Sequence, residues 1–387
     1  MSAYTLLHDA EASADPSSTP EPFKILTKHI SFSNHDEHEW WHKSGPMMAR
    51  MLVAANYDIH QQYRYLCLYA LHIVPMMGPF PSIDRPQLYK TPFTSQGTLE
   101  ISTNFMRSRA TLRMSIEPID YRPMAGLDAF NRVVPGQMLN RLKQAGVKVD
   151  MSLYHQLIHR LTLSDEEDAA LRDCDGVKNL PYQSQSMVAL DFGNEDAMVK
   201  LYLFPGAKAH VTGTCCSDLI FSAVKTINAD ESFKDALAAL ESYCLDLPAS
   251  AQVHWISVDL VKPTASRCKI YVFDGQVDFE RVSDFWTMGG KLASPGNSRG
   301  LGLLRELWDA LDMSGDLHNQ NDTAREFVCL LANYELQPGR SLPEPKIYIN
   351  LSGISDLGVA KTVSSFIERH VNTEQGRAYI DNVASFV

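Results

Sequence analysis

Three short stretches share one pattern, and this pattern decides the fold: VKLYLF (199–204), CKIYVF (268–273) and PKIYIN (345–350). Each stretch places a lysine and a tyrosine two residues apart, with a leucine or an isoleucine between them. Because residues i and i+2 of a β-strand point to the same face, the lysine and the tyrosine share one side and the aliphatic residue faces the other. The sequence therefore predicts three strands that each have one cationic, aromatic face and one apolar face.

The elements around these stretches recur in a constant order, two strands followed by two helices. We expect strands at 98–105, 110–116, 186–193, 197–204, 252–261, 266–273, 326–336 and 345–351. We expect helices over 36–76, with an interruption at Gly45-Pro46, and at 127–144, 151–163, 215–227, 231–246, 277–286, 300–312, 356–370 and 374–385. A repeat of roughly 70–90 residues indicates one repeated architecture. The expected fold is a single α+β domain over residues 23–387, an antiparallel barrel with its helices outside, after a disordered tail (1–22).

If the strands close into a barrel, their cationic faces line its interior. The first hairpin supplies Arg113 at the corresponding place, and Arg267 shares a face with Lys269. The alternative is an exposed strand face on a half-buried sheet, but the recurrence at equivalent places favours a lumen. The predicted lumen ring contains Arg113, Lys200, Arg267, Lys269 and Lys346, together with Tyr202, Tyr271 and Tyr348.

Such a ring suits an anion of high charge, and a diphosphate ester fits because lysine and arginine offer charge-assisted hydrogen bonds. The cations can take the part that a divalent metal usually plays beside a departing diphosphate, so we expect neither a metal nor another cofactor. Electron-rich tyrosine rings stabilise a carbocation and exclude water. The residues therefore predict an enzyme that ionises an organic diphosphate.

Glu100 is the one acidic residue on the first predicted strand. It faces opposite to Leu99 and Ile101, and thus toward the lumen. One interpretation is that its carboxylate accepts a hydrogen bond from a second substrate. The other is that it balances the local positive charge, and the spacing alone leaves both open.

The overall composition excludes several classes of protein. The 387 residues contain 35 Lys+Arg and 46 Asp+Glu, and this net charge of −11 argues against wrapping nucleic acid. There is no apolar run long enough to span a membrane and no signal peptide. The seven cysteines form neither a CxxC pair nor a disulfide framework. We expect a cytoplasmic enzyme whose partners are small-molecule substrates, with no nucleic acid and no membrane; a homodimer is left open.

Two segments could suggest metal binding. Asp165 to Asp168 is a run of four acids, but it lacks the Asp-Asp-x-x-Asp spacing and follows Ser164, so we interpret it as a capped helix start. His35, His38 and His42 are spaced for one helical face. A zinc site needs a tighter arrangement with a further ligand, and a surface helix is the favoured interpretation.

An ordered set of motifs makes the chain resemble a known family. The motifs, in order, are WWHKSGPMMARMLVAANYDIHQQYRYLCLYALHIVPMMGPFP (40–81), EISTNF (100–105), LRMSIEPI (112–119), VALDF (188–192), VKLYLFP (199–205), SRCKIYVFD (266–274), FWTMGGKL (285–292) and PEPKIYI (343–349). From about residue 23 to 385 the chain resembles the fungal indole prenyltransferases of the dimethylallyl tryptophan synthase superfamily. Its N-terminal stretch is most similar to members that act on tryptophan-containing cyclic dipeptides and related indole alkaloids.

The resemblance implies a ten-stranded ABBA barrel and a metal-independent Friedel–Crafts reaction, in which dimethylallyl diphosphate ionises and an aromatic carbon attacks the cation. Glu100 matches the glutamate that hydrogen-bonds the indole N–H. Lys346 falls where many members have glutamine, and a basic residue there is compatible with diphosphate binding. The base that removes the ring proton is not assigned. The remaining matches are diphosphate binding by Arg113, Lys200, Arg267 and Lys269, and a tyrosine shield formed by Tyr202, Tyr271 and Tyr348.

One departure from the family concerns its last hairpin, which carries two further shield tyrosines and closes the barrel. Eight strands are expected here, so the barrel is expected to lack the last strand pair. A second hypothesis is therefore a truncated, catalytically weak or inactive paralogue that only binds, because an open barrel admits water to the cation. A third is a prenyltransferase whose acceptor is a phenolic or polyketide aromatic in place of an indole.

Overall fold

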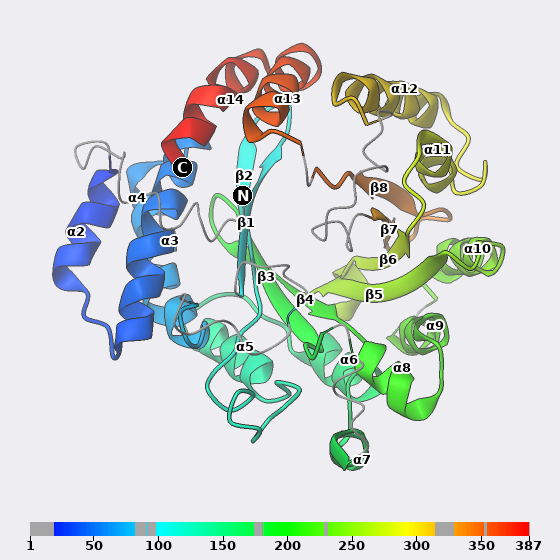
Figure 1. Ribbon diagram of the computed structural model, residues 1–387, viewed down its shortest axis with the longest axis horizontal. Helices are drawn as coiled ribbons and strands as arrows, with labels where there is room; N and C mark the ends of the chain where they lie inside the picture. Colours follow the sequence, from blue (N-terminus) through cyan, green and yellow to red (C-terminus); the bar gives the residue numbers. More distant parts are fainter. Residues whose placement is uncertain are drawn as a thin grey trace.

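The computed structural model describes residues 19–81, 91, 98–173, 180, 182–227, 231–313, 329–351 and 354–386. Within these residues eight strands form one antiparallel sheet, and each strand pairs with its neighbours in the chain. The sheet curls around an interior, and the helices lie on its outer side (Figure 1). The α+β ABBA architecture predicted from the sequence is confirmed. The strands are β1 Leu99–Phe105, β2 Ala110–Ile116, β3 Ser186–Phe192, β4 Ala197–Leu203, β5 Ala251–Asp259, β6 Cys268–Asp274, β7 Leu330–Leu336 and β8 Glu344–Tyr348.

The sheet is a half-barrel. The pairing runs in order from β1 to β8, and no pairing between the edge strands β1 and β8 is present among the described residues. The register brings Arg113 on β2 opposite Asp191 on β3, and Lys200 on β4 opposite Asp259 on β5. Side chains that share one face on successive strands are thereby placed in rows around the interior.

The helices precede the sheet and follow each hairpin. Their outer layer contacts the sheet through α5, α6, α9, α10 and α11, and α14 packs back against α3. The helical segments are α2 Glu21–His29, α3 His35–Ala54, α4 Ile59–Leu68, η2 Tyr69–Ile73, η3 Val74–Met76, α5 Val134–Gln144, α6 Ser152–Leu161, α7 Asp165–Asp173, α8 Gly206–Thr212, α9 Cys216–Ile227, α10 Lys234–Leu245, η5 Pro263–Ala265, α11 Phe279–Thr287, α12 Pro295–Ala310, α13 Asp356–His370 and α14 Thr373–Phe386.

Polar side chains cap the starts of several helices. The Asp58 carboxylate accepts a hydrogen bond from the Gln61 backbone N–H at 2.9 Å, while the Gln61 side chain accepts one from the Asp58 N–H, which completes a capping box at α4. Ser294 caps α12, whose first residue is Pro295. Most predicted helices differ from the observed ones by only a few residues, but these two caps were not used in the prediction, and α12 begins at Pro295 and not at the expected residue 300.

The expected interruption of the first helix at Gly45-Pro46 is wrong, because α3 continues unbroken from His35 to Ala54. Trp41 and Leu52 on either side of Pro46 are fully buried, so tertiary packing outweighs the backbone hydrogen bond that proline removes. Gly45 allows this packing, since a Cβ at this position would lie 2.6 Å from Cε2 of Phe23.

The N-terminal region contains one helix that the sequence reasoning missed. Helix α2 begins at Glu21, inside the segment expected to be a tail, and its Phe23 ring stacks on Trp41 with centroids 4.7 Å apart. Residues 1–18 of that expected tail lie outside the described residues. Helix α2 therefore packs against α3 and α4 and belongs to the fold.

The hydrophobic core fills the space between the outer face of the sheet and the helices. Leu201 and Ile270, the aliphatic residues of two Lys-x-Tyr stretches, are fully buried there, and Ile347 packs partly buried against the same core. The predicted division of each strand into an apolar outer face and a polar inner face is confirmed. It orients every lysine and tyrosine of the three stretches toward the interior.

The six cysteines among the described residues are free, and Cys174 lies outside that part of the chain. Among the described helices, none combines the length and the apolar character that crossing a bilayer requires. The expectation of a cytoplasmic location stays a prediction.

Leu201→Ala tests the role of the outer face. We expect it to lower the free energy of unfolding by about 2–5 kcal/mol, because it leaves a cavity in a fully packed layer. Leu245→Ala is the matched control: Leu245 is 81% exposed, and a change below about 0.5 kcal/mol is expected there. Denaturant unfolding measures both, and equal effects of the two variants would contradict a core on this face.

Candidate active site

The inner face of the half-barrel carries all eight predicted ring residues and Glu100. Alternation along the strands places Glu100 on β1, Arg113 on β2, Lys200 and Tyr202 on β4, Lys269 and Tyr271 on β6, and Lys346 and Tyr348 on β8. Arg267 directly precedes β6 and reaches the same cluster through its guanidinium. The structure thus brings together residues that lie up to about 250 positions apart in the chain.

Asp191 holds two of the cations. Its carboxylate lies 3.3 Å from Nε of Arg113 and forms an ion pair with Nζ of Lys200. Lys200 is only 3% exposed, and its burial lowers the pKa of the ammonium while Asp191 opposes that shift. The buried charge of Lys200 is therefore supported by a carboxylate on the neighbouring strand.

Two further carboxylates hold Arg267 and Lys269. Nε of Arg267 lies 2.7 Å from Asp259, and its Nη1 lies 3.4 Å from Glu335. Nζ of Lys269 lies 3.2 Å from the other oxygen of Glu335. Burial would raise the pKa of Glu335, but the charges of Lys269 and Arg267 outweigh burial and hold it below its usual range. Glu335 is therefore ionised and bridges both cations.

Lys346 differs from the other four cations, because no ion pair to a carboxylate is present for it within the described part of the chain. Its Nζ lies over the Tyr348 ring, 4.6 Å from the centroid, and its side chain is exposed to the interior. Burial among protein atoms, followed by the charges of Arg113, Lys269 and Lys200, lowers its pKa to about 8. An ammonium with three cationic neighbours loses its proton more readily than a lysine in water.

The three tyrosines form one aromatic cluster beside these cations. The Tyr271 ring centroid lies 5.9 Å from that of Tyr202 and 6.2 Å from that of Tyr348. Trp255 stacks on Tyr271 at 5.5 Å, and the Asn333 side chain donates a hydrogen bond of 2.7 Å to the Tyr348 hydroxyl. Burial raises the pKa of all three tyrosines, so they stay neutral.

Glu100 lies at the open edge of the interior, on the first strand of the sheet. Its side chain is open to the interior, yet the protein atoms that surround it raise the pKa of its carboxyl group, while the charge of Lys346 lowers it. Lys346 thus influences Glu100 from the opposite edge strand. The structure leaves the Glu100 carboxylate available to a donor in the interior.

The sequence reasoning missed the three acids and the tryptophan of this site. Asp191, Asp259 and Glu335 each lie on the inner face of a strand, because each is separated by an even number of positions from another inward-facing residue of that strand. Strand alternation could have assigned these faces, since each acid lies within a predicted strand. The pairing of each acid with its cations depends on the register between strands, which no local pattern specifies.

The two segments that could suggest metal binding, the acidic run at 165–168 and the histidines of α3, lie outside the half-barrel. Ser164 and Glu167 form a reciprocal cap at the start of α7, in which the Ser164 Oγ accepts from the Glu167 N–H at 3.2 Å. Arg132, Arg172 and Lys208 pair with the acids of the run. The interpretation of this segment as a capped helix start is confirmed.

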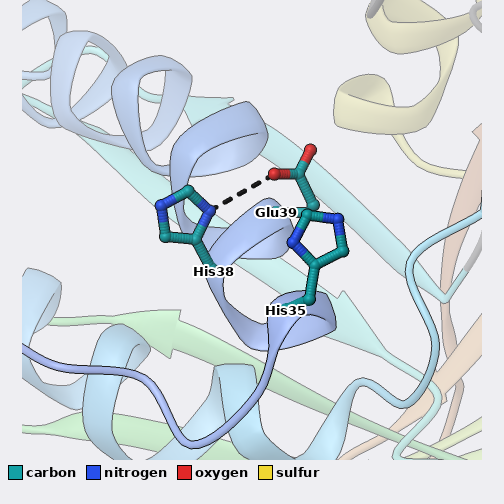
Figure 2. A group of neighbouring side chains, drawn as sticks. All are labelled: His35, His38 and Glu39. Atoms are coloured by element: carbon teal, nitrogen blue, oxygen red, sulfur yellow. Dashed lines mark hydrogen bonds and ion pairs between the residues drawn. The ribbon is translucent and has the colours of Figure 1, made fainter.

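His35, His38 and Glu39 cluster on the first turns of α3 (Figure 2), where their potential ligand atoms all lie within 4.8 Å of one another. Both histidines are exposed, and Nδ1 of His38 lies 3.3 Å from Glu39. This exposure confirms the surface-helix interpretation. The positive end of the helix dipole lies at these residues and disfavours a bound cation.

Comparison with known proteins matches this architecture to one family. The sequence profile described as tryptophan dimethylallyltransferase matches residues 36–382. The prenyltransferase nanD of Aspergillus nanangensis is 34% identical, over 94% of this chain and 87% of that protein. The roquefortine prenyltransferase roqD of Penicillium rubens is also 34% identical, over 94% and 86%. The crystal structure of NotF in complex with brevianamide F and DMSPP is 27% identical and superposes with a TM-score of 0.82, over 95% of this chain and 90% of that one.

The lowered pKa of Lys346 predicts that the stability of the protein depends on pH. Its pKa is about 8 in the folded chain and close to 10.4 when unfolded, so between these values the unfolded chain binds more protons and stability rises with pH. We expect wild type to gain thermal stability relative to Lys346→Met between pH 8 and 9.5. Melting temperatures of both proteins across this range measure the effect, and parallel curves would contradict the lowered pKa.

Proposed function

We propose that this chain, which belongs to the tryptophan dimethylallyltransferase family of aromatic prenyltransferases, transfers a dimethylallyl group to an indole carbon of an alkaloid precursor. The donor is dimethylallyl diphosphate, and the reaction is an electrophilic aromatic substitution that requires no metal. The proposed acceptor class is tryptophan-containing cyclic dipeptides and related indoles. Support for an indole comes from the family profile and from the relative solved with brevianamide F.

The observation that carries this proposal is the contact between the cationic cluster and the aromatic cluster on one inner face. Lys200 and Tyr202 lie two residues apart on β4, Lys269 and Tyr271 on β6, and Lys346 and Tyr348 on β8. A diphosphate held by the cations leaves its allylic carbon beside the tyrosine rings. The rings then stabilise the cation at the place where it forms, by about 0.5–2 kcal/mol for each well-placed ring.

The cations support metal-independent ionisation. Five positive side chains converge on the interior, and the three nearby carboxylates Asp191, Asp259 and Glu335 balance only part of this charge. The excess positive charge can stabilise the negative charge that develops on the departing diphosphate oxygen. In this proposal the diphosphate-binding residues are Arg113, Lys200, Arg267, Lys269 and Lys346, and the shielding residues are Tyr202, Tyr271 and Tyr348.

Glu100 supplies the acceptor contact in this proposal. Its carboxylate accepts a hydrogen bond from the indole N–H, which raises the electron density of the ring carbon that attacks. The raised pKa of Glu100 marks a carboxylate that water solvates poorly and that gains from a donor. Its place on the edge strand β1 leaves it outside the ion pairs of Asp191.

Incubation of the purified chain with dimethylallyl diphosphate and a panel of acceptors tests the function. The panel contains tryptophan, tryptophan-containing cyclic dipeptides and phenolic aromatics, each with and without EDTA, and product mass and NMR are the readouts. We expect a prenylated indole at a rate that EDTA leaves unchanged. Prenylated phenols alone would overturn the indole acceptor, a strict requirement for Mg²⁺ would overturn metal independence, and prenyl alcohol alone would indicate a chain that binds but does not transfer.

Lys269→Ala tests the diphosphate cluster. We expect a loss of turnover of at least about 100-fold, because one charge that stabilises the leaving group is removed. Folding is expected to survive, since Glu335 keeps its contact with Arg267. Lys225→Ala is the matched control, because Lys225 pairs with Glu241 on the exposed surface. Unchanged turnover in Lys269→Ala, measured beside this control, would exclude the role of the cluster.

A further inference from the structure

Asn333 on β7 is a buried amide on the inner face, and the proposed function gives it no role. It is 1% exposed, and the register places it opposite Tyr271 on β6 and opposite Lys346 on β8. Residues that are directly paired on neighbouring strands share one face, so Asn333 lies in one row with a shield tyrosine and a cation. Burying an amide costs free energy unless its polar atoms form hydrogen bonds. An apolar side chain would fill this position without that cost, and the amide therefore indicates a function.

The Asn333 side chain holds the hydroxyl group of Tyr348. Its Nδ2 donates a hydrogen bond of 2.7 Å to Tyr348 Oη. The amide is itself fixed in place, because β7 is paired on both sides, with β6 and with β8. Since the hydroxyl lies at the far end of the ring, a hydrogen bond at this atom fixes the direction of the ring axis and with it the χ1 rotamer. The Tyr348 hydroxyl accepts this bond and keeps its own proton for the Tyr271 hydroxyl.

Tyr348 depends on such an anchor more than Tyr271 does. The Tyr271 ring lies beside the rings of Tyr202, Trp255 and Tyr348, with centroids 5.9, 5.5 and 6.2 Å away. Tyr348 lies on β8, an edge strand of the described sheet, and among the described residues its ring has Tyr271 as its aromatic neighbour and the Lys346 ammonium 4.6 Å from its centroid. Packing holds a ring that neighbours enclose, whereas a ring on an edge strand is held by the hydrogen bonds of its hydroxyl.

We propose that Asn333 is a positioning residue that holds the Tyr348 ring beside the site of the allylic cation. This inference rests on the proposed function. The carbon–oxygen bond of dimethylallyl diphosphate breaks with its electron pair on the diphosphate oxygen. An indole carbon then captures the cation, which forms a carbon–carbon bond, or water captures it, which forms prenyl alcohol; each capture releases one proton to the diphosphate or to solvent. Asn333 favours capture by the indole through Tyr348, because a ring held in place stabilises the cation and excludes water.

Asn333→Leu tests the inference, because leucine fills a similar space and cannot donate a hydrogen bond. We expect the ratio of prenyl alcohol to prenylated indole to rise. We expect kcat for the prenylated product to fall by about 2- to 30-fold, the loss that follows when one ring no longer stabilises the cation. KM for dimethylallyl diphosphate is expected to change by less than about twofold, because no diphosphate-binding cation is removed. Chromatography of both products measures the ratio and the rates.

A double-mutant cycle with Tyr348→Phe tests whether the effect passes through the hydroxyl group. Tyr348→Phe keeps a ring but removes the acceptor of the hydrogen bond, so it is expected to shift the product ratio in the same direction. When both substitutions are combined, the second is expected to change kcat by less than about twofold, since the hydrogen bond is already lost. Effects that multiply in the double variant would show that Asn333 does not act through Tyr348, and this result would overturn the inference.

Tyr334→Phe is the matched control. Tyr334 follows Asn333 on β7, is fully buried on the outer face, and donates a hydrogen bond of 2.8 Å from its hydroxyl to the backbone oxygen of Phe285. This substitution therefore removes a buried hydrogen bond from the same strand but not from the shield. We expect a lower melting temperature and an unchanged product ratio. If the control shifts the ratio as Asn333→Leu does, the role of Asn333 is only structural and the inference fails.

Asn333→Ala is the second variant if Asn333→Leu does not fold, and it is expected to shift the product ratio in the same direction. A folded variant of Asn333 with the kcat and the product ratio of wild type overturns the inference. The wild-type reaction separates the two proposals. If wild type prenylates no acceptor, the proposed function itself fails, and the inference with it; if wild type prenylates an indole and the variants of Asn333 behave as wild type, only the role of Asn333 fails.

Discussion

The structure depends on the balance between five cations and three carboxylates inside the half-barrel. Two like charges 4 Å apart repel by about 4 kcal/mol at an effective dielectric constant of 20, so cations gathered on one face without carboxylates would destabilise the sheet. Asp191 joins β2 to β4 through Arg113 and Lys200, and Glu335 joins β6 to β7 through Lys269. The same ion pairs that hold neighbouring strands together also orient the cations toward the interior. No such carboxylate pairs with Lys346 within the described residues, and its burial together with the charges of the neighbouring cations lowers its pKa.

Burial of the apolar outer face offsets the free-energy cost of a polar interior. A sheet whose inner face is charged must bury its other face, and Leu201 and Ile270 are fully buried beneath the helices. The helices therefore supply most of the apolar burial, while the strands place the chemistry. A shift of one residue in the register of a strand would turn its apolar side chains toward the interior and its charged side chains toward the helices.

Much of the fold could be predicted because its signals are local. The Lys-x-Tyr alternation indicates strands, and Ser164 before an acidic run indicates the start of α7. Local signals fail where distant residues decide the outcome. Gly45-Pro46 reads as a helix break, but the stacking of Phe23 on Trp41 holds α3 together through the proline. Helix α2 was missed because distant residues order it: Phe23 stacks on Trp41 of α3, and the helix also packs against α4.

The sequence by itself determined which side chains share the inner face, because the two-residue period of a strand is a local property that needs no neighbour. It thereby placed the cations, the tyrosines and Glu100 on one side of the sheet. Only the tertiary structure decided which acid meets which base, that Trp255 stacks on Tyr271, and that no carboxylate of the described residues pairs with Lys346. These contacts follow from strand register and from the curvature of the sheet, which bring together segments far apart in the chain. The charge state of a buried group depends on such neighbours, and so the chemistry of each lysine is a property of the fold.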